Sequence, residues 1–179
     1  MNSAQAWEAG GFFNWLRKDK EGQTMITSPD YLGVDVGEPE WYYDYKDIPE
    51  EYQKYLFLSN TTGELEDCKL KGVVVENGNA MKKISESWIV AGNKKVNVGV
   101  YVYEDKVLML RDKYDQYIYQ YSYNVNNCAH DVFEKEGDSE EKEYSIFFYD
   151  NNKRYFVAGQ LEVEMMRELA IAYMNFVIK

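Results

Sequence analysis

Alternation of apolar and polar residues marks the middle of the chain as a series of β-strands. The clearest case is residues 96–103, in which valine occupies every second position up to Val102. This period of two is typical of a strand that is buried on one face. Similar reasoning predicts strands at residues 68–76, 84–91, 107–111, 117–123, 144–149 and 153–158. Because short turns separate most of these segments, we expect an antiparallel meander.

Helical periodicity appears near both ends of the chain. Residues 161–178 repeat apolar positions at helical spacing, and the expected apolar side is Leu161, Met165, Leu169, Tyr173 and Phe176, beside Met166, Ala172 and Val177. Residues 3–18 fit a helix less well because Gly10 and Gly11 interrupt it. Asp47 is expected to cap a short helix that buries Tyr52, Tyr55 and Leu56.

These elements predict one domain over residues 1–179, of the α+β class. An antiparallel β-meander sheet would pack against a C-terminal helix and one or two short N-terminal helices. The chain contains two cysteines, Cys68 and Cys128, for which we expect free buried thiols. With no secretory signal and no apolar run of membrane-spanning length, the expected location is the cytoplasm.

The charge is strongly acidic and unevenly distributed. There are 31 Asp and Glu against 20 Lys and Arg, for a net charge of −11. Residues 35–51 hold seven acids and one base, and residues 131–143 hold seven acids and two bases, so the remainder is neutral. This charge disfavours nucleic acids and anionic membranes as partners and favours a basic protein.

No residue pattern in the sequence indicates a particular chemical reaction. The single histidine, His130, follows Cys128 by two residues, but a zinc site or a Cys–His nucleophile needs further partners. We expect Cys128 to anchor a short helix and His130 to be partly exposed. Phosphate-binding glycine loops and the serine-nucleophile motif are absent from the sequence. The expectation is a protein without cofactor, metal or enzymatic activity.

The most informative segment combines aromatic and acidic residues. Its members are Glu38, Glu40, Trp41, Tyr42, Tyr43, Asp44, Tyr45 and Asp47. Tyr and Trp dominate binding hot spots, and neighbouring carboxylates attract a basic partner. The alternative is that the aromatic side chains belong to the core and the acids keep the loop soluble. The aromatic side chains cannot all face inward, so some must be exposed or covered by another element.

Two further segments have ordinary structural explanations. The second acidic segment contributes Glu134, Glu136, Asp138, Glu140 and Glu141, which are expected in a solvated loop that adds long-range attraction. Four tyrosines alternate over residues 117–123 and could stack on sugars or bases, but the buried face of a strand is favoured.

In size, charge and lack of a catalytic constellation, the chain resembles immunity proteins of bacterial toxin systems, such as contact-dependent growth inhibition. The two acidic segments carry this resemblance. It implies binding of one cognate basic toxin, commonly a nuclease, and inhibition by occlusion. Two alternatives stay open: a phage-type inhibitor that mimics DNA, and a carbohydrate-binding or hydrolytic protein that uses the aromatic–acidic segment.

Overall fold

The computed structural model describes residues 37–61, 68–112, 117–137 and 140–179. Its strands are β1 (Pro39–Tyr42), β2 (Lys69–Asn77), β3 (Met81–Val90), β4 (Lys94–Tyr103), β5 (Tyr117–Val125), β6 (Cys128–Lys135), β7 (Tyr144–Asp150) and β8 (Lys153–Gly159). Its helices are the 3-10 turns η1 (Tyr45–Asp47) and η3 (Ala91–Asn93), and α4 (Glu50–Gln53), α5 (Phe57–Thr61), α6 (Lys106–Arg111) and α7 (Val163–Val177). The predicted α+β class is confirmed. The helix predicted at residues 3–18 lies outside the described residues.

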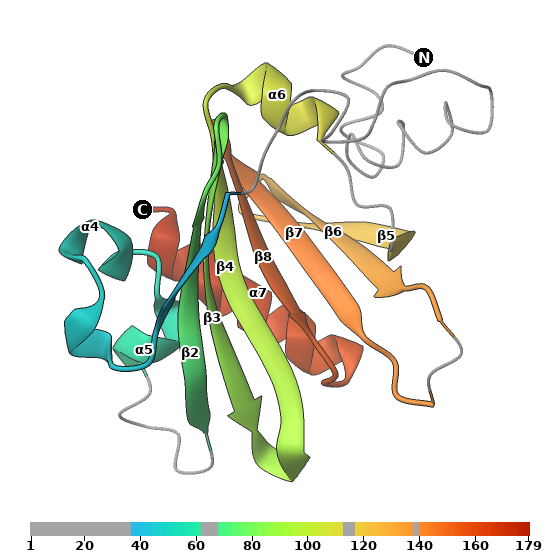
Figure 1. Cartoon of the computed structure of the whole chain (residues 1–179). Coiled ribbons are helices and arrows are strands. Elements are labelled where there is room, and N and C mark those ends of the chain that lie inside the picture. Colours follow the sequence, from blue (N-terminus) through green and yellow to red (C-terminus); the bar gives the residue numbers. More distant parts are fainter. Residues whose placement is uncertain (1–36, 62–67, 113–116, 138–139) are drawn as a thin grey trace.

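The described strands form one eight-stranded antiparallel sheet in the order β1-β2-β3-β4-β8-β7-β6-β5 (Figure 1). The first four strands follow the chain. The chain then passes through α6 to the far edge and returns through β5 to β8, which pairs with β4. The β5–β6 turn is built by Asn126 and Asn127, whose φ angles are 50° and 63°. Asparagine tolerates this left-handed conformation, which a tight hairpin turn requires.

One face of the sheet, called here the helix face, holds the main core. The predicted valine face is confirmed on β4, where Val96, Val98 and Val100 are completely buried. Helix α7 lies behind the sheet in Figure 1 and packs on β7 and β8. At this contact the ring of Tyr173 meets the stacked rings of Phe148 and Tyr155 edge-on. Non-polar burial of this kind is the main stabilising contribution to the fold.

The buried side of α7 agrees with the prediction at Met166 and Tyr173 and differs from it at Met165. Met166, Ala170, Tyr173 and Met174 are buried, whereas Met165 is 53% exposed. Methionine occupies both positions 165 and 166, so the sequence pattern alone leaves the rotation of the helix ambiguous. Packing against the rings of β7 and β8 decides it.

Residues 107–111 were predicted as a strand, and this is wrong because they lie in α6. The Asp105 carboxylate accepts a hydrogen bond of 2.8 Å from the Leu108 amide, which caps the start of the helix. A short apolar run does not distinguish strand from helix by its period, so this local cap decides. The predicted cap at Asp47 is also wrong, since Pro49 precedes α4 and Asp47 ends η1.

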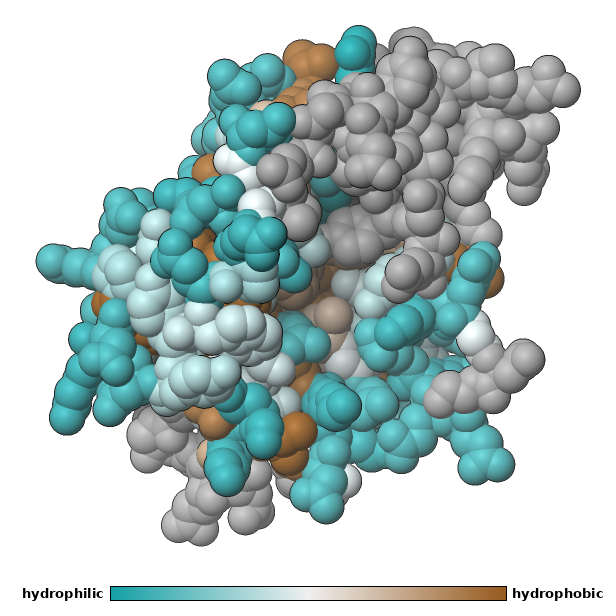
Figure 2. All heavy atoms as spheres, in the orientation of Figure 1, coloured by the Kyte–Doolittle hydropathy of each residue, from teal (hydrophilic) through white to brown (hydrophobic). Residues whose placement is uncertain are grey.

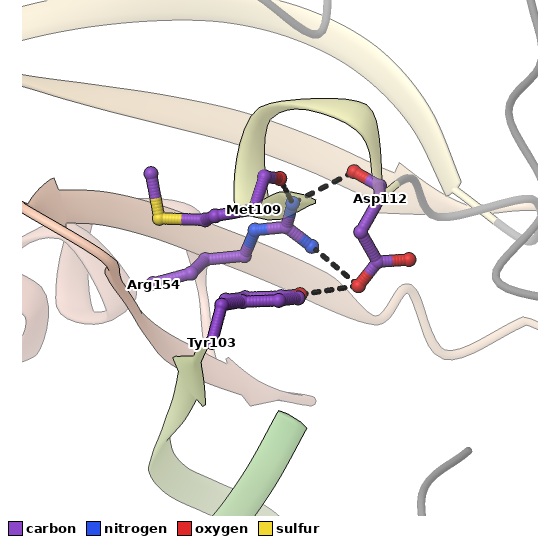
Figure 3. Close-up of polar contacts among 4 residues, drawn as sticks. All are labelled: Tyr103, Met109, Asp112 and Arg154. Carbon is purple, nitrogen blue, oxygen red and sulfur yellow. Dashed lines mark hydrogen bonds and ion pairs between the residues drawn. The ribbon is translucent and has the colours of Figure 1, made fainter. Parts of the chain in front are cut away.

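A completely buried arginine attaches α6 to the opposite face of the sheet, called here the open face (Figure 3). Arg154 Nη2 donates to the carbonyl oxygens of Met109 and Asp112, each at 2.7 Å. Its Nη1 lies 3.5 Å from the Asp112 carboxylate, which also accepts from the Tyr103 hydroxyl. The guanidinium thus satisfies carbonyl groups that the end of a helix leaves without partners.

A buried carboxylate attaches α5 to the helix face. Glu86 accepts hydrogen bonds from the Leu58 amide at 2.5 Å, the Ser59 amide at 3.0 Å and the Ser59 hydroxyl at 2.7 Å. Burial raises the pKa of Glu86, and these hydrogen bonds oppose that change by stabilising the anion. The start of α5 therefore depends on a side chain that is 27 residues or more away in sequence.

None of the helices in the described ranges is long and apolar enough to span a bilayer.

Replacing Glu86 tests this attachment. Glu86→Ala leaves the two amide donors of Leu58 and Ser59 without their acceptor, and we expect the free energy of unfolding to fall by about 2 kcal/mol or more. Glu86→Gln keeps one side-chain oxygen and should cost less. Urea unfolding measures both variants. An alanine variant as stable as the wild type would contradict the assigned role.

Candidate functional site

Two neighbouring aromatic side chains project from the edge of the sheet. Trp41, in β1, is 52% exposed, and Tyr43, just after it, is 73% exposed. Their rings stack with centroids 6.3 Å apart and an interplanar angle of 11°. They lie over Gly72, where a Cβ would come within 3.4 Å of both rings. Large exposed aromatic surface of this kind is characteristic of binding sites.

The other two aromatic residues of this segment are held by the body of the protein. Tyr42 and Tyr45 are partly buried and pack against the main core. The Tyr45 hydroxyl donates to the Asn60 side-chain oxygen at 2.8 Å, which ties η1 to the end of α5. Two of the four aromatic residues therefore anchor the segment to the core, and the other two are exposed to solvent.

The acids of the segment lie in β1 and in the residues next to it. Glu38, Glu40, Asp44 and Asp47 are all exposed. Glu40 pairs with Val75 and Trp41 with Val74, so the two side chains point to opposite faces of the sheet. Glu40 also accepts a hydrogen bond of 2.9 Å from the Tyr42 hydroxyl. The Asp44 carboxylate accepts from the Lys46 amide at 3.0 Å and caps η1.

A groove of about 390 Å³ crosses the open face and begins at β1. We call it the open-face groove. One wall contains Pro39 and Trp41, and the lining on the far half of the sheet includes Tyr117 and Glu143. In Figure 2 a hollow opens between two largely hydrophilic rims of this side of the molecule. The groove thus connects the aromatic–acidic segment with the last residue of the second acidic segment.

The second acidic segment is partly neutralised by lysines. Glu134 lies 3.1 Å from the Lys142 amine, and Glu141 lies 2.7 Å from the Lys94 amine. Glu136 and Glu140 are exposed, and Asp138 lies outside the described residues. Since exposed ion pairs contribute little to stability, their main consequence is a smaller local negative charge.

Asp131 was counted with the acids of residues 131–143 as part of an acidic patch, and that is wrong because its side chain is completely buried in β6. Its carboxylate accepts hydrogen bonds from the Ser122 hydroxyl and, at 3.1 Å, from the Tyr149 hydroxyl. Burial raises the pKa of Asp131 to about 7, although these bonds and the Arg154 charge oppose the rise.

The tyrosine stripe of β5 is not one buried face. A bulge between Tyr119 and Tyr121 changes the register, so Tyr119 pairs with Phe133 and Tyr121 with Val132. Tyr119 consequently belongs to the open face, whereas Tyr121 and Tyr123 lie on the helix face. There the Arg167 guanidinium lies 4.5 Å from the Tyr123 ring centroid. All four tyrosines of this edge strand keep some exposure.

His130 was predicted to be partly exposed near a short helix, and both expectations are wrong. It lies in β6, is completely buried, and stacks on Tyr123 with ring centroids 4.9 Å apart. Its Nδ1 is 3.1 Å from the Cys128 carbonyl oxygen. Burial lowers the pKa of His130 and raises that of Cys128, which disfavours a thiolate–imidazolium pair. Cys68 and Cys128 are free and only partly buried.

Sequence reasoning missed the groove and its lining. Glu76 lines it and forms an ion pair of 2.9 Å with Lys83, while Glu143 accepts from the Tyr117 hydroxyl at 2.9 Å. Isolated Glu and Lys residues in strands form no recognisable motif. Their pairing could have been predicted only from the register of the strands. Within the described ranges, no three His, Cys, Asp or Glu side chains gather as metal ligands.

In comparisons with known proteins, no family model, curated protein or solved structure matches this chain.

The raised pKa of Asp131 predicts a pH-dependent stability. Between the unfolded value of 3.8 and the folded value of about 7, the native state holds a proton that the unfolded state releases. Stability from this group is therefore complete at low pH and falls as the pH rises to 7, by up to about 1.4 kcal/mol per pH unit.

Urea unfolding of the wild type and Asp131→Asn between about pH 4.5 and 7.5 measures this contribution. The difference in unfolding free energy, wild type minus variant, should decrease with rising pH. His130 is present in both proteins and cancels. Glu140→Gln, which removes an exposed carboxylate, controls for the lost charge. A pH-independent difference would refute the assignment.

Proposed function

We propose that this protein binds a basic protein partner, such as a cognate toxin with nuclease activity, and neutralises it by occlusion in the cytoplasm. The observation that carries the proposal is the stacked, exposed pair of Trp41 and Tyr43 on a sheet edge bordered by exposed carboxylates. Burying such a pair in a complex would supply a large apolar contact area.

The pair is already ordered before binding. Tyr42 and Tyr45, on either side of Tyr43, are anchored in the core, and Trp41 lies in a paired strand. An ordered surface loses less conformational entropy on association than a loose loop does. The acids Glu38, Glu40 and Asp44 would increase the rate of encounter with a basic partner, and the aromatic rings would slow dissociation.

A protein that mimics DNA is supported less well. Such a mimic needs carboxylates in continuous rows that stand in for phosphates. In the described part of the chain, lysines are paired with Glu134, Glu141 and Glu143, which breaks up the acidic surface of the second segment. The aromatic pair also has no counterpart in a phosphate backbone.

Capture of the tagged protein from an extract of its native cells, at low and moderate salt, tests the proposal. A basic protein retained in stoichiometric amount would then be purified and assayed with and without this chain. Stoichiometric inhibition of its activity supports neutralisation. If no basic protein is retained even at low salt, the proposal fails.

Variants of the exposed residues distinguish contacts that slow dissociation of the partner from charges that speed its association. Tyr43→Ala removes a ring that is 73% exposed and should weaken partner binding by about 10- to 100-fold, mainly through faster dissociation. Thermal unfolding should be unchanged, because the ring makes little contact with the core. Surface plasmon resonance with the purified partner measures the rates, and an unchanged dissociation rate would contradict the role of Tyr43.

Asp44 offers a matched pair of charge variants. Asp44→Lys should slow association several-fold at low salt, and the effect should shrink at high salt because ions screen exposed charges. Asp44→Asn keeps an oxygen that can accept from the Lys46 amide and changes the charge by half as much. If both variants associate with the partner as fast as the wild type at low salt, Asp44 does not contribute electrostatic attraction.

A further inference from the structure

The floor of the open-face groove is made of small polar side chains from neighbouring strands. Ser87 in β3 pairs with Asn97 in β4, Asn97 pairs with Ala158 in β8, and Ala158 pairs with Ser145 in β7. Paired residues point to the same face, so these four side chains form a row across the sheet. Ser85, two residues before Ser87, lies beside this row.

Gly99, between Ser85 and Phe156 in the sheet, leaves space in the middle of the groove. Gly99 pairs with Ser85, and a Cβ at position 99 would collide with the Ile84 carbonyl oxygen and lie 2.7 Å from the Ser85 Cβ. Aromatic side chains stand around this floor instead, among them Trp41, Tyr101 and Tyr117. The volume of about 390 Å³ is within the range of small-ligand sites.

The polar side chains of the floor have no hydrogen-bond partner within the described part of the chain. The structure shows no hydrogen bond between the side chains of Ser85, Ser87, Asn97 or Ser145 and any other described residue. Ser87 and Asn97 are partly exposed, whereas Ser85 and Ser145 are 7% and 2% exposed. The Ser87 hydroxyl and the Asn97 amide are thus the floor groups most accessible to a ligand, and Ser85 and Ser145 lie deeper in the lining.

The charges of the groove are already balanced. The Glu76 carboxylate is 2.9 Å from the Lys83 amine, and the Glu143 carboxylate is 3.4 Å from the Lys135 amine. A cationic ligand would have to compete with these lysines, and an anionic one would meet two carboxylates. A neutral ligand avoids both costs and can still donate hydroxyl hydrogen bonds to the carboxylate oxygens.

We propose that the open-face groove binds a neutral, polyhydroxylated ligand of mono- or disaccharide size. The hydroxyls of such a ligand would bond to the floor and to Glu76 and Glu143, and its apolar C–H face would pack on Trp41 or Tyr101. Aromatic walls with a few convergent polar groups are the usual composition of a small-molecule site. This inference does not depend on the proposed protein partner.

Saturation-transfer NMR on the full chain tests the proposal. The probes are glucose, galactose, mannose, N-acetylglucosamine, maltose and lactose, with cationic glucosamine and anionic glucuronate as charged comparisons. We expect saturation transfer to at least one neutral sugar at concentrations up to about 10 mM, and weaker transfer to both charged probes. Titration of the best neutral sugar then gives its dissociation constant.

Ser87→Val and Asn97→Val locate the site. Each removes a floor group while placing a strand-favouring residue in β3 or β4, so the fold should persist. Each should weaken binding of the best sugar by about tenfold, the value of one or two hydrogen bonds. Asn124→Val is the matched control, because Asn124 is an exposed residue of β5 that does not line the groove, and it should leave sugar binding unchanged.

Three results would overturn the proposal. One is no transfer to any neutral sugar, and another is sugar binding that the valine variants leave unchanged. The third is binding of an oligolysine peptide with amide shifts at residues 85, 87 and 97, which would assign the groove to a basic segment of a protein partner. If the chain binds a basic partner but no sugar, only this inference fails. If it binds a sugar but no basic partner, only the proposed function fails.

Discussion

The pairing of β4 with β8 is the constraint on which the rest of the structure depends. These strands are about fifty residues apart in sequence, and they join a meander of β1–β4 to a meander of β5–β8. Their register places Val98 opposite Val157 beneath α7 and Asn97 opposite Ala158 on the open face. A shift of one residue would exchange the two faces of the strand, exposing valines and burying the amide. The main core and the groove floor therefore result from the same alignment.

Buried charged side chains hold the helices on this sheet. Arg154 binds the end of α6 on the open face, and Glu86 binds the start of α5 on the helix face. Both side chains come from strands and end at backbone groups that short helices leave without partners. Because these helices have only six and five residues, they gain little from their own hydrogen bonding. The strands position them, and the desolvation of each charge is offset by hydrogen bonds to the backbone.

The sequence predicted the regular parts of the fold because their patterns are local. Valine alternation in β4 and the turn residues around it were sufficient for the antiparallel meander, and both hold in the structure. The prediction failed at residues 107–111, where a capping aspartate outweighed a strand-like run, and at Met165 of α7, which is exposed while the adjacent Met166 is buried. It also failed at Asp131, because a carboxylate in an acidic segment gives no sign that a distant Tyr149 will bury it.

The predicted site residues show a similar division. The local composition of residues 38–47 indicated an exposed aromatic surface, but only pairing with β2 determines that Trp41 faces the groove while Glu40 faces the other side. The groove is lined by residues of β1 to β5, β7 and β8, so no single segment of the sequence could reveal it.

Trp41 has a position that connects the two proposed sites. Its ring lines the open-face groove and also stacks on Tyr43 outside it. A ligand in the groove and a protein on the β1 edge would therefore contact the same indole. Any displacement of the ring by one of them changes the surface offered to the other, and thermodynamic linkage requires the effect to be equal in both directions. Because Trp41 lies in the edge strand β1, its ring is 52% exposed and can contact both a ligand and a protein, whereas Tyr101 is half-buried in the central strand β4. The edge position of β1 thus makes Trp41 the residue through which the two binding events would be coupled.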